Sequence, residues 1–168
     1  PDFPGRDLSS VGLIVWGGAA MDEATIRRLA RICPRLATNY GMTETTSAIT
    51  AVPPTHDIDQ LAHSVGGPFP GVEVRLVQAD GTLAGTGQVG EVQARSQLNF
   101  LGYWRRPDAT RVAFTPDGFF RTGDLAELRS DGSYHIAGRI KEMYKSGGYN
   151  VYPREIETAL EDHPAVAA

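Results

Sequence analysis

The sequence predicts a chain of mixed α/β and α+β class that is organised in three parts. A short apolar run followed by an amphipathic helical pattern predicts the strand–helix–strand end of an α/β domain within residues 1–60. Alternating apolar and polar residues between turn signals predict a small β-barrel-like module over residues 61–140. A glycine pair followed by a helix-opening proline predicts a loop and then a helix within residues 141–168, so that the chain contains pieces of at least two domains.

The first part rests on one strand–helix–strand pattern. The apolar run Val11–Trp16 ends at Gly17, as a buried strand followed by a turn does. Asp22 is of the residue type that caps helix N-termini. The apolar face of the following helix has the spacing i, i+3, i+4, i+7 and consists of Ile26, Leu29, Ala30 and Cys33. Residues 36–39 then predict a second strand, which completes the unit.

Two hairpins are predicted in the second part. Residues 72–76 and 92–95 both alternate apolar with polar side chains, which is typical of half-buried strands. The dipeptide at 131–132 is Asp-Gly, a strong hairpin turn signal that places residues 125–128 opposite residues 134–137.

Prolines mark the starts of two further helices. Pro107 is predicted to open a short helix that continues through Val112, and Pro153 a second helix that continues to about Asp162. On this second helix, Ile156, Ala159 and Leu160 are expected to face inward.

Composition excludes several classes of function. The formal net charge of −4 and the pI near 5.5 argue against a nucleic-acid scaffold, which would show a basic patch. No apolar run approaches the roughly 20 residues of a membrane helix, and no secretory signal pattern begins the chain. The single cysteine, Cys33, excludes an internal disulfide framework and favours a cytoplasmic location. Both ends of the chain are expected to be cut ends.

The segment 39–47, Asn-Tyr-Gly-Met-Thr-Glu-Thr-Thr-Ser, follows the second predicted strand, where open α/β sheets place their ligands. Tyr40 could stack on a nucleobase, and Thr43 could bind a phosphate oxygen. Glu44 offers the hard oxygen ligand that Mg²⁺ accepts. The alternative is that Tyr40 and Met42 are core residues and that Thr43 and Glu44 are only solvated.

Asp124 is the second candidate. It follows a glycine in the segment Phe-Arg-Thr-Gly-Asp at 120–124, at the expected start of a strand. A carboxylate there can accept hydrogen bonds from both cis hydroxyls of a ribose. An aspartate near a turn can also be a local cap, and the segment by itself leaves both interpretations open.

The run 138–157 contains four basic residues, an adjacent glycine pair and a helix-opening proline. Glycine lacks a Cβ, so such a loop can approach an anionic ligand closely. An ordinary surface loop with solvated charges is the alternative for this run taken alone.

The order of these segments resembles the adenylate-forming (AMP-binding) superfamily, which includes acyl-CoA synthetases, peptide-synthetase adenylation domains and luciferases. The resemblance covers nearly the whole chain. The local form of residues 145–153, Lys-Ser-Gly-Gly-Tyr-Asn-Val-Tyr-Pro, is most similar to the acyl-CoA synthetase branch. In that family, residues 1–140 would be the C-terminal part of the large AMP-binding domain, and residues 141–168 would be the hinge and the truncated beginning of a small α+β C-terminal domain.

The resemblance implies a role for each candidate. Asp124 would hold the ribose hydroxyls with help from Arg139, and Tyr40 would stack on adenine. Glu44 would bind Mg²⁺, and Met42 would border the acyl pocket. The full set of implied nucleotide contacts is Gly18, Ala19, Tyr40, Gly41, Thr43, Asp124 and Arg139, of which Ala19 would also line the acyl pocket.

The resemblance further implies a moving C-terminal part. Lys141 would be the hinge of a domain rotation between two half-reactions. For Arg139 and Lys145, the alternative is that they are ordinary surface charges. After rotation, Lys145 would enter the site as a catalytic residue beside Thr43 and Glu44. Gly147 and Gly148 would shape the channel for the thiol of coenzyme A.

The implied reaction joins a carboxylic acid, expected to be a fatty acid, to ATP as acyl-AMP and then to coenzyme A. The family's phosphate-binding loop and a second lysine are expected upstream of Pro1 and beyond Ala168, so that the chain alone would lack full activity. Two alternatives remain: an acyl-AMP ligase or adenylation domain that loads a carrier protein, and a nucleotide-binding module without catalysis.

Overall fold

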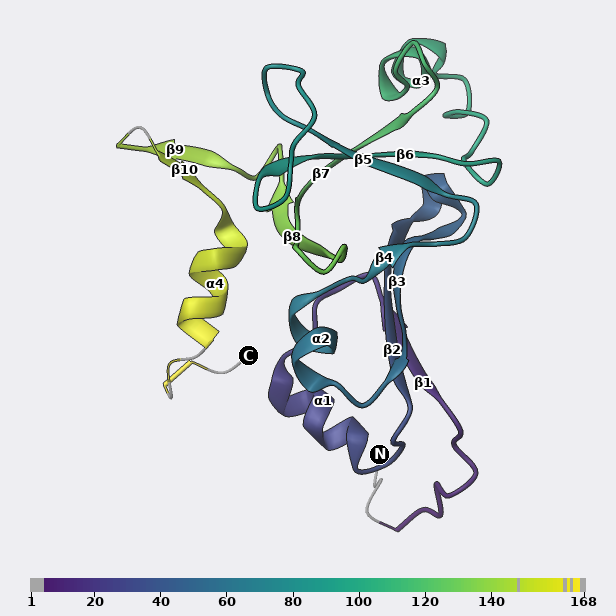
Figure 1. Ribbon diagram of the computed structural model, residues 1–168, viewed down its shortest axis with the longest axis vertical. Helices are drawn as coiled ribbons and strands as arrows, with labels where there is room; N and C mark the ends of the chain where they lie inside the picture. Colours follow the sequence, from purple (N-terminus) through teal and green to yellow (C-terminus); the bar gives the residue numbers. More distant parts are fainter. Residues whose placement is uncertain (1–4, 148, 162, 164, 167–168) are drawn as a thin grey trace.

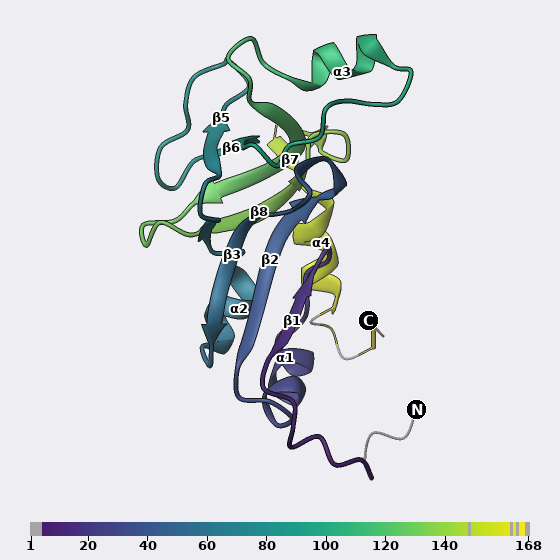
Figure 2. The same cartoon turned by 90° about the vertical axis from the view of Figure 1, so that its right-hand side faces the viewer.

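The computed structural model describes residues 5–147, 149–161, 163 and 165–166. Its strands form two four-stranded sheets and one two-stranded hairpin (Figures 1 and 2). The elements, in chain order, are β1 (Ile14–Gly17), α1 (Glu23–Ala30), β2 (Leu36–Met42), the 3₁₀ turn η1 (Thr43–Thr45), β3 (Ser47–Thr55), α2 (Ile58–His63), β4 (Gly67–Pro68), β5 (Glu73–Val77), β6 (Val89–Arg95), α3 (Pro107–Ala113), β7 (Phe120–Leu128), β8 (Tyr134–Arg139), β9 (Tyr144–Ser146), β10 (Tyr149–Val151) and α4 (Pro153–Glu161).

The first sheet is mixed and has the strand order β1-β2-β3-β4. Strand β1 runs parallel to β2, whereas β2 and β3, and β3 and β4, are antiparallel. Helices α1 and α2 lie together against one face of this sheet (Figure 1). The buried core between them and the sheet consists of Ile26, Leu36, Val52 and Leu61.

The predicted start of α1 is confirmed, because Oδ1 of Asp22 accepts a hydrogen bond of 2.8 Å from the backbone N–H of Thr25. The prediction for the second strand was too short. Strand β2 continues to Met42, which pairs with Ser47 on β3. Tyr40 and Gly41 therefore lie on a strand and not in the loop that follows it.

Strand β3 was not predicted, because it contains Pro53 and Pro54. The pairing between β2 and β3 shifts register there: Leu36 lies opposite Thr55, while Thr38 lies opposite Val52. Two residues of β3, Pro53 and Pro54, therefore face a single residue of β2, which is the geometry of a β-bulge. A missing backbone N–H is tolerated at a bulge.

The second sheet is antiparallel and has the strand order β5-β6-β7-β8. Both predicted hairpins are confirmed, with Leu76 opposite Val92 and Ala126 opposite Ile136. The barrel-like closure is not found: among the described residues, β5 and β8 are the two edges of an open sheet. Closure of a barrel requires the last strand to pair with the first, and no pairing joins β5 to β8 in the described part of the chain.

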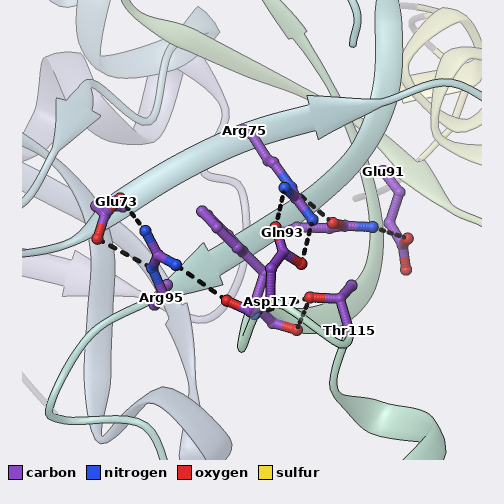
Figure 3. Close-up of polar contacts among 8 residues, drawn as sticks. Glu73, Arg75, Glu91, Gln93, Arg95, Thr115 and Asp117 are labelled. Carbon is purple, nitrogen blue, oxygen red and sulfur yellow. Dashed lines mark hydrogen bonds and ion pairs between the residues drawn. The ribbon is translucent and has the colours of Figure 1, made fainter. Parts of the chain in front are cut away.

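One face of this second sheet carries a network of charged side chains (Figure 3). Asp117 accepts hydrogen bonds of 2.7 and 3.1 Å from the two terminal nitrogens of Arg75. Arg95 pairs with Glu73 at 2.7 Å and donates to the backbone carbonyl of Asp117 at 2.9 Å. Both guanidinium groups lie over the ring of Phe119, at 4.0 and 4.5 Å from its centroid. The network ties the loop before β7 to β5 and β6.

The two sheets meet through backbone hydrogen bonds. The N–H of Val65 donates to the carbonyl of Tyr134 at 2.8 Å, and the N–H of Tyr134 donates to the carbonyl of Gly66 at 2.9 Å. Nδ1 of His135 lies 2.9 Å from the carbonyl oxygen of His63. These contacts fix β8 against the segment between α2 and β4.

The C-terminal part consists of the hairpin β9–β10 and helix α4, which Figure 1 shows projecting to one side of the two sheets. The prediction that Ile156, Ala159 and Leu160 face inward is not met, because all three are exposed, Ile156 to 42% and Leu160 to 54%. No helix in the described part of the chain is both long and apolar enough to span a membrane.

Candidate functional site

A hydrogen-bonded triad of side chains joins the two sheets. The hydroxyl of Tyr40, near the end of β2, donates to Oδ2 of Asp124 at 2.7 Å. Nε of Arg139 lies 3.1 Å from Oδ1 of the same carboxylate. Asp124 lies within β7, and not at the strand start that the sequence predicted, opposite Arg139 on β8. Its side chain is 8% exposed, whereas that of Arg139 is 65% exposed.

The surroundings perturb both acidic groups of the triad. Burial raises the pKa of Asp124 above its ordinary value, although the hydrogen bond from Tyr40 and the charge of Arg139 act in the opposite direction. Burial, and then the charge of Asp124, raise the pKa of Tyr40. Tyr40 thus stays a hydrogen-bond donor at neutral pH. Burial of a carboxylate costs solvation free energy, and carboxylates with a pKa perturbed in this way are common at functional sites.

Beside the triad, the turn that connects β2 to β3 has an unusual backbone. Thr46 and Ser47 have φ values of 53° and 113°, which residues with side chains rarely adopt. Gly41 makes this geometry possible: a Cβ built on it would lie 1.5 Å from the carbonyl oxygen of Ser47. Strain of this kind persists where the surrounding structure enforces it and is frequent at functional sites.

An open depression of about 470 Å³ lies along this turn. Its lining residues are Asn39, Gly41, Met42, Thr43, Thr46 and Ser47. Gly17, at the end of β1, pairs with Asn39, so the exposed Gly18 and Ala19 emerge beside the depression. Carboxyl ends of parallel strands meet at one edge of a sheet, which is where open α/β sheets bind ligands.

Glu44 lies in η1, directly after Thr43, and is half-buried. Its Oε1 accepts a hydrogen bond of 3.0 Å from the hydroxyl of Tyr103, while Oε2 has no partner among the described residues. No group of three or more His, Cys, Asp or Glu side chains in the described part could hold a metal ion alone. Mg²⁺ is often held by one carboxylate together with substrate phosphates and waters, and Glu44 fits that mode.

No hydrogen bond or ion pair links the described C-terminal candidates, Lys141, Lys145 and Gly147, to the triad or to Glu44. The side chains of Lys141 and Lys145 are exposed, and neither has a hydrogen bond or ion pair within the described ranges. Lys141 lies in the turn after β8, and Lys145 lies on β9. Gly147 forms the tip of the β9–β10 hairpin with a φ of 57°, and Gly148 lies outside the described residues.

Several residues of the site were not found by sequence reasoning. Asn39 and Tyr103 were assigned no role, because an asparagine or tyrosine near a glycine is common in loops. Thr122 also escaped notice, although its hydroxyl accepts a hydrogen bond of 3.0 Å from the backbone N–H of Asp124. Thr122 lies two residues before Asp124 on β7, whereas Asn39 reaches the site through pairing with β1 and Tyr103 through its contact with Glu44.

Comparison with known proteins places this geometry in a family. The model of the AMP-binding enzyme family matches residues 1–104. The medium/long-chain-fatty-acid–CoA ligase FadD8 of Mycobacterium tuberculosis is 38% identical over 168 residues, which are 99% of this chain and 29% of that protein. The chain therefore spans less than a third of the length of this relative.

Two solved structures are similar over most of the chain. The amide bond synthetase McbA of Marinactinospora thermotolerans has a TM-score of 0.85 at 36% identity, over 100% of this chain and 34% of that one. The O-succinylbenzoate coenzyme A synthetase MenE of Bacillus subtilis, solved with ATP and magnesium ion, has a TM-score of 0.80 at 31% identity, over 92% of this chain and 32% of that one. With a family match over more than half of its residues, this chain belongs to the AMP-binding enzymes.

Proposed function

We propose that this chain is the nucleotide-binding part of an AMP-forming acid–thiol ligase of the acyl-CoA synthetase type. The single observation that carries the proposal is the buried Asp124 carboxylate, held by Tyr40 and Arg139 next to the depression at the end of β2. A buried carboxylate with a cationic neighbour is suited to paired hydroxyl groups such as those of a ribose.

In this proposal, each side of the site contacts a different part of ATP. Asp124 and Arg139 hold the ribose, and Tyr40 borders the adenine. Gly18 and Ala19 let the ligand approach the backbone closely, since neither carries more than a methyl group, and Gly41 borders the ligand through its backbone. Thr43 faces the depression and is exposed, so its hydroxyl can donate to an α-phosphate oxygen.

The first half-reaction is attack of a carboxylate on the α-phosphate, which gives acyl-AMP and pyrophosphate. Negative charge on the phosphate is stabilised by fixed donors such as the Thr43 hydroxyl. Glu44 would hold Mg²⁺ through Oε2, and the ion would neutralise phosphate charge when bound.

The second half-reaction is attack of the coenzyme A thiol on acyl-AMP, with release of AMP. We propose that Lys141 is the hinge that precedes it and that Lys145, Gly147 and Gly148 then border the thiol channel. The exposure of Lys141 and Lys145 supports this proposal, because an unpaired side chain can move without breaking contacts. In the same proposal, residues 1–140 belong to the large domain and residues 141–168 begin the small one.

For the acid, we propose a fatty acid, which is supported by the 38% identity with the fatty-acid–CoA ligase. Met42 and Ala19 would line the apolar end of its pocket. We propose a cytoplasmic location, which the single buried cysteine, Cys33, supports.

A second candidate function differs in the acceptor. The similarity to an amide bond synthetase supports an amine as this alternative acceptor. The amine would attack the acyl-AMP in the second half-reaction, and the first half-reaction would be the same. A carrier protein that presents a pantetheine thiol is a further acceptor. A nucleotide-binding module without catalysis would bind ATP and form no acyl-AMP.

The test is carboxylate-dependent exchange of pyrophosphate into ATP, measured on the longer protein that we propose contains this chain. We expect exchange in the wild type and a loss of at least about 100-fold in Glu44→Gln. The control Glu127→Gln should show near-normal exchange, because Glu127 borders a different depression. Adding coenzyme A, holo-carrier protein or an amine then identifies the acceptor.

ATP binding without any exchange would contradict the proposed catalytic activity and favour a nucleotide-binding module without catalysis. Robust exchange by the 168-residue chain alone would contradict the need for further segments.

A further inference from the structure

A single segment of the chain holds the turn that carries Glu44. Residues 98–103, between β6 and α3, meet the turn through three hydrogen bonds. The hydroxyl of Thr46 donates to the carbonyl of Leu98 at 2.6 Å. The N–H of Phe100 donates to the carbonyl of Glu44 at 2.7 Å, and the hydroxyl of Tyr103 donates to Oε1 of Glu44 at 3.0 Å. Both the backbone and the side chain of Glu44 are therefore fixed from this side.

The segment is itself anchored by aromatic packing. The ring of Phe100 lies 4.8 Å from that of Tyr103, edge to face, and 5.4 Å from that of Phe120. Phe120 is 2% exposed and opens β7, the strand that also carries Asp124. Aromatic pairs at these distances add directional packing energy to the burial of the rings. The orientation of the Tyr103 ring is thus set by a buried part of the second sheet.

Helix α3 supplies a second anchor. The hydroxyl of Thr110 accepts the backbone N–H of Tyr103 at 2.9 Å and donates to the carbonyl of Arg106 at 3.0 Å. Gly102 has a φ of 145°, and a Cβ on it would lie 2.6 Å from Cγ2 of Thr110. A side chain at position 102 would therefore separate the helix from the segment and move Tyr103.

We infer that Tyr103 is a positioning residue for Glu44, and that its hydroxyl occupies one carboxylate oxygen so that the other is presented to the metal ion of the bound nucleotide. The inference rests on the proposed function. The geometry supports it because Oε2 of Glu44 has no partner among the described residues, while Oε1 is held by a side chain that is anchored twice. Partners that orient a metal-binding carboxylate commonly affect metal affinity 10–100-fold when they are removed.

The rival explanation is that Tyr103 only packs the loop. Packing and positioning differ in what they predict for the metal. A loop that is loosened would weaken ATP binding with and without Mg²⁺, whereas a misplaced Glu44 would weaken only the gain in affinity that Mg²⁺ provides.

The experiment measures ATP binding to the longer protein by calorimetry, once with excess Mg²⁺ and once with EDTA. In Tyr103→Phe, which keeps the ring, we expect the Mg²⁺-dependent gain in ATP affinity to fall about tenfold, while the affinity in EDTA stays within about twofold of the wild type. A second pair of variants tests the anchor: Thr110→Val, which removes the hydroxyl, should reproduce part of this loss, and Thr110→Ser, which keeps it, should not.

The outcomes separate the two proposals. A wild type that binds ATP more tightly with Mg²⁺, together with a Tyr103→Phe variant whose gain is unchanged, would overturn the positioning role alone. Equal losses in Mg²⁺ and in EDTA would also overturn it and favour packing. A wild type that binds no ATP would overturn the proposed function, and the positioning role with it.

Discussion

The hydroxyl of Tyr40 donates a hydrogen bond of 2.7 Å to Oδ2 of Asp124, although the two residues lie 84 positions apart in the chain. One belongs to the mixed sheet and the other to the antiparallel sheet, so the bond crosses between the two sheets. The ring of Tyr40 also packs against the core of the second sheet. The same side chain therefore joins the two sheets and orients the carboxylate that we propose binds ribose.

The link between the sheets predicts the effect of Tyr40→Phe. The variant leaves a buried carboxylate with one partner fewer, and a hydrogen bond to a charged group contributes about 1.5–3 kcal/mol. We expect the free energy of unfolding in urea to fall by about 2 kcal/mol and ATP to bind about tenfold more weakly. The control is Tyr134→Phe, because burial alone raises the pKa of Tyr134 and no hydrogen bond of its hydroxyl is found in the described part of the chain. Equal effects of the two variants would contradict a special role of the Tyr40 hydroxyl.

Gly41 should not tolerate any side chain. The Cβ of an alanine there would lie 1.5 Å from the carbonyl oxygen of Ser47, so the β2–β3 turn would have to move. We expect Gly41→Ala to lower the free energy of unfolding by more than about 3 kcal/mol and to abolish pyrophosphate exchange. Gly12→Ala is the matched control, because a Cβ at Gly12 meets nothing within 4 Å. A Gly41→Ala variant with wild-type stability and exchange would show that the turn can relax.

The Arg75–Asp117 pair should make stability depend on pH in the acid range. Hydrogen bonding to Arg75, and then to Thr115, lowers the pKa of Asp117 from 3.8 to about 2. Because the folded-state pKa is the lower one, the stabilisation is present above pH 4 and is lost as the pH falls toward about 2.

The matching experiment compares urea unfolding of the wild type and Asp117→Asn from pH 7 to pH 2. The variant should be less stable at neutral pH, and the difference should shrink between about pH 4 and pH 2. Arg75→Met removes the largest cause of the lowered pKa of Asp117 and should shrink the same pH-dependent part. Parallel curves for the wild type and Asp117→Asn below pH 4 would contradict the prediction.

The proposed hinge predicts an unequal loss of the two half-reactions. Proline fixes φ, so Lys141→Pro should hinder rotation about this residue. We expect pyrophosphate exchange to stay near the wild-type rate while thioester formation falls about 100-fold. Lys141→Ala keeps the backbone free and should retain both half-reactions. An equal loss of exchange and of thioester formation in Lys141→Pro would argue against a hinge.

Much of the fold was predictable where local physics decides it. Asp22 caps its helix, Pro107 opens α3, and the Asp-Gly turn at 131–132 joins β7 and β8. Strand β3 was missed because its two prolines argue against a strand, and only the bulge opposite β2 makes them acceptable. The barrel-like module proved to be an open sheet, because alternation of apolar residues indicates strands and says nothing about whether the edges pair.

The sequence by itself determined the family, the order of most elements and the residue types that suit a nucleotide. These follow from short-range patterns: caps, turns, alternation and the spacing of motifs. Only the tertiary structure decided that Tyr40 meets Asp124 and that Tyr103 meets Glu44. Such pairs depend on which strands lie side by side and in which register, and the free energy that selects the register is spread over the packing of both sheets rather than over neighbouring residues.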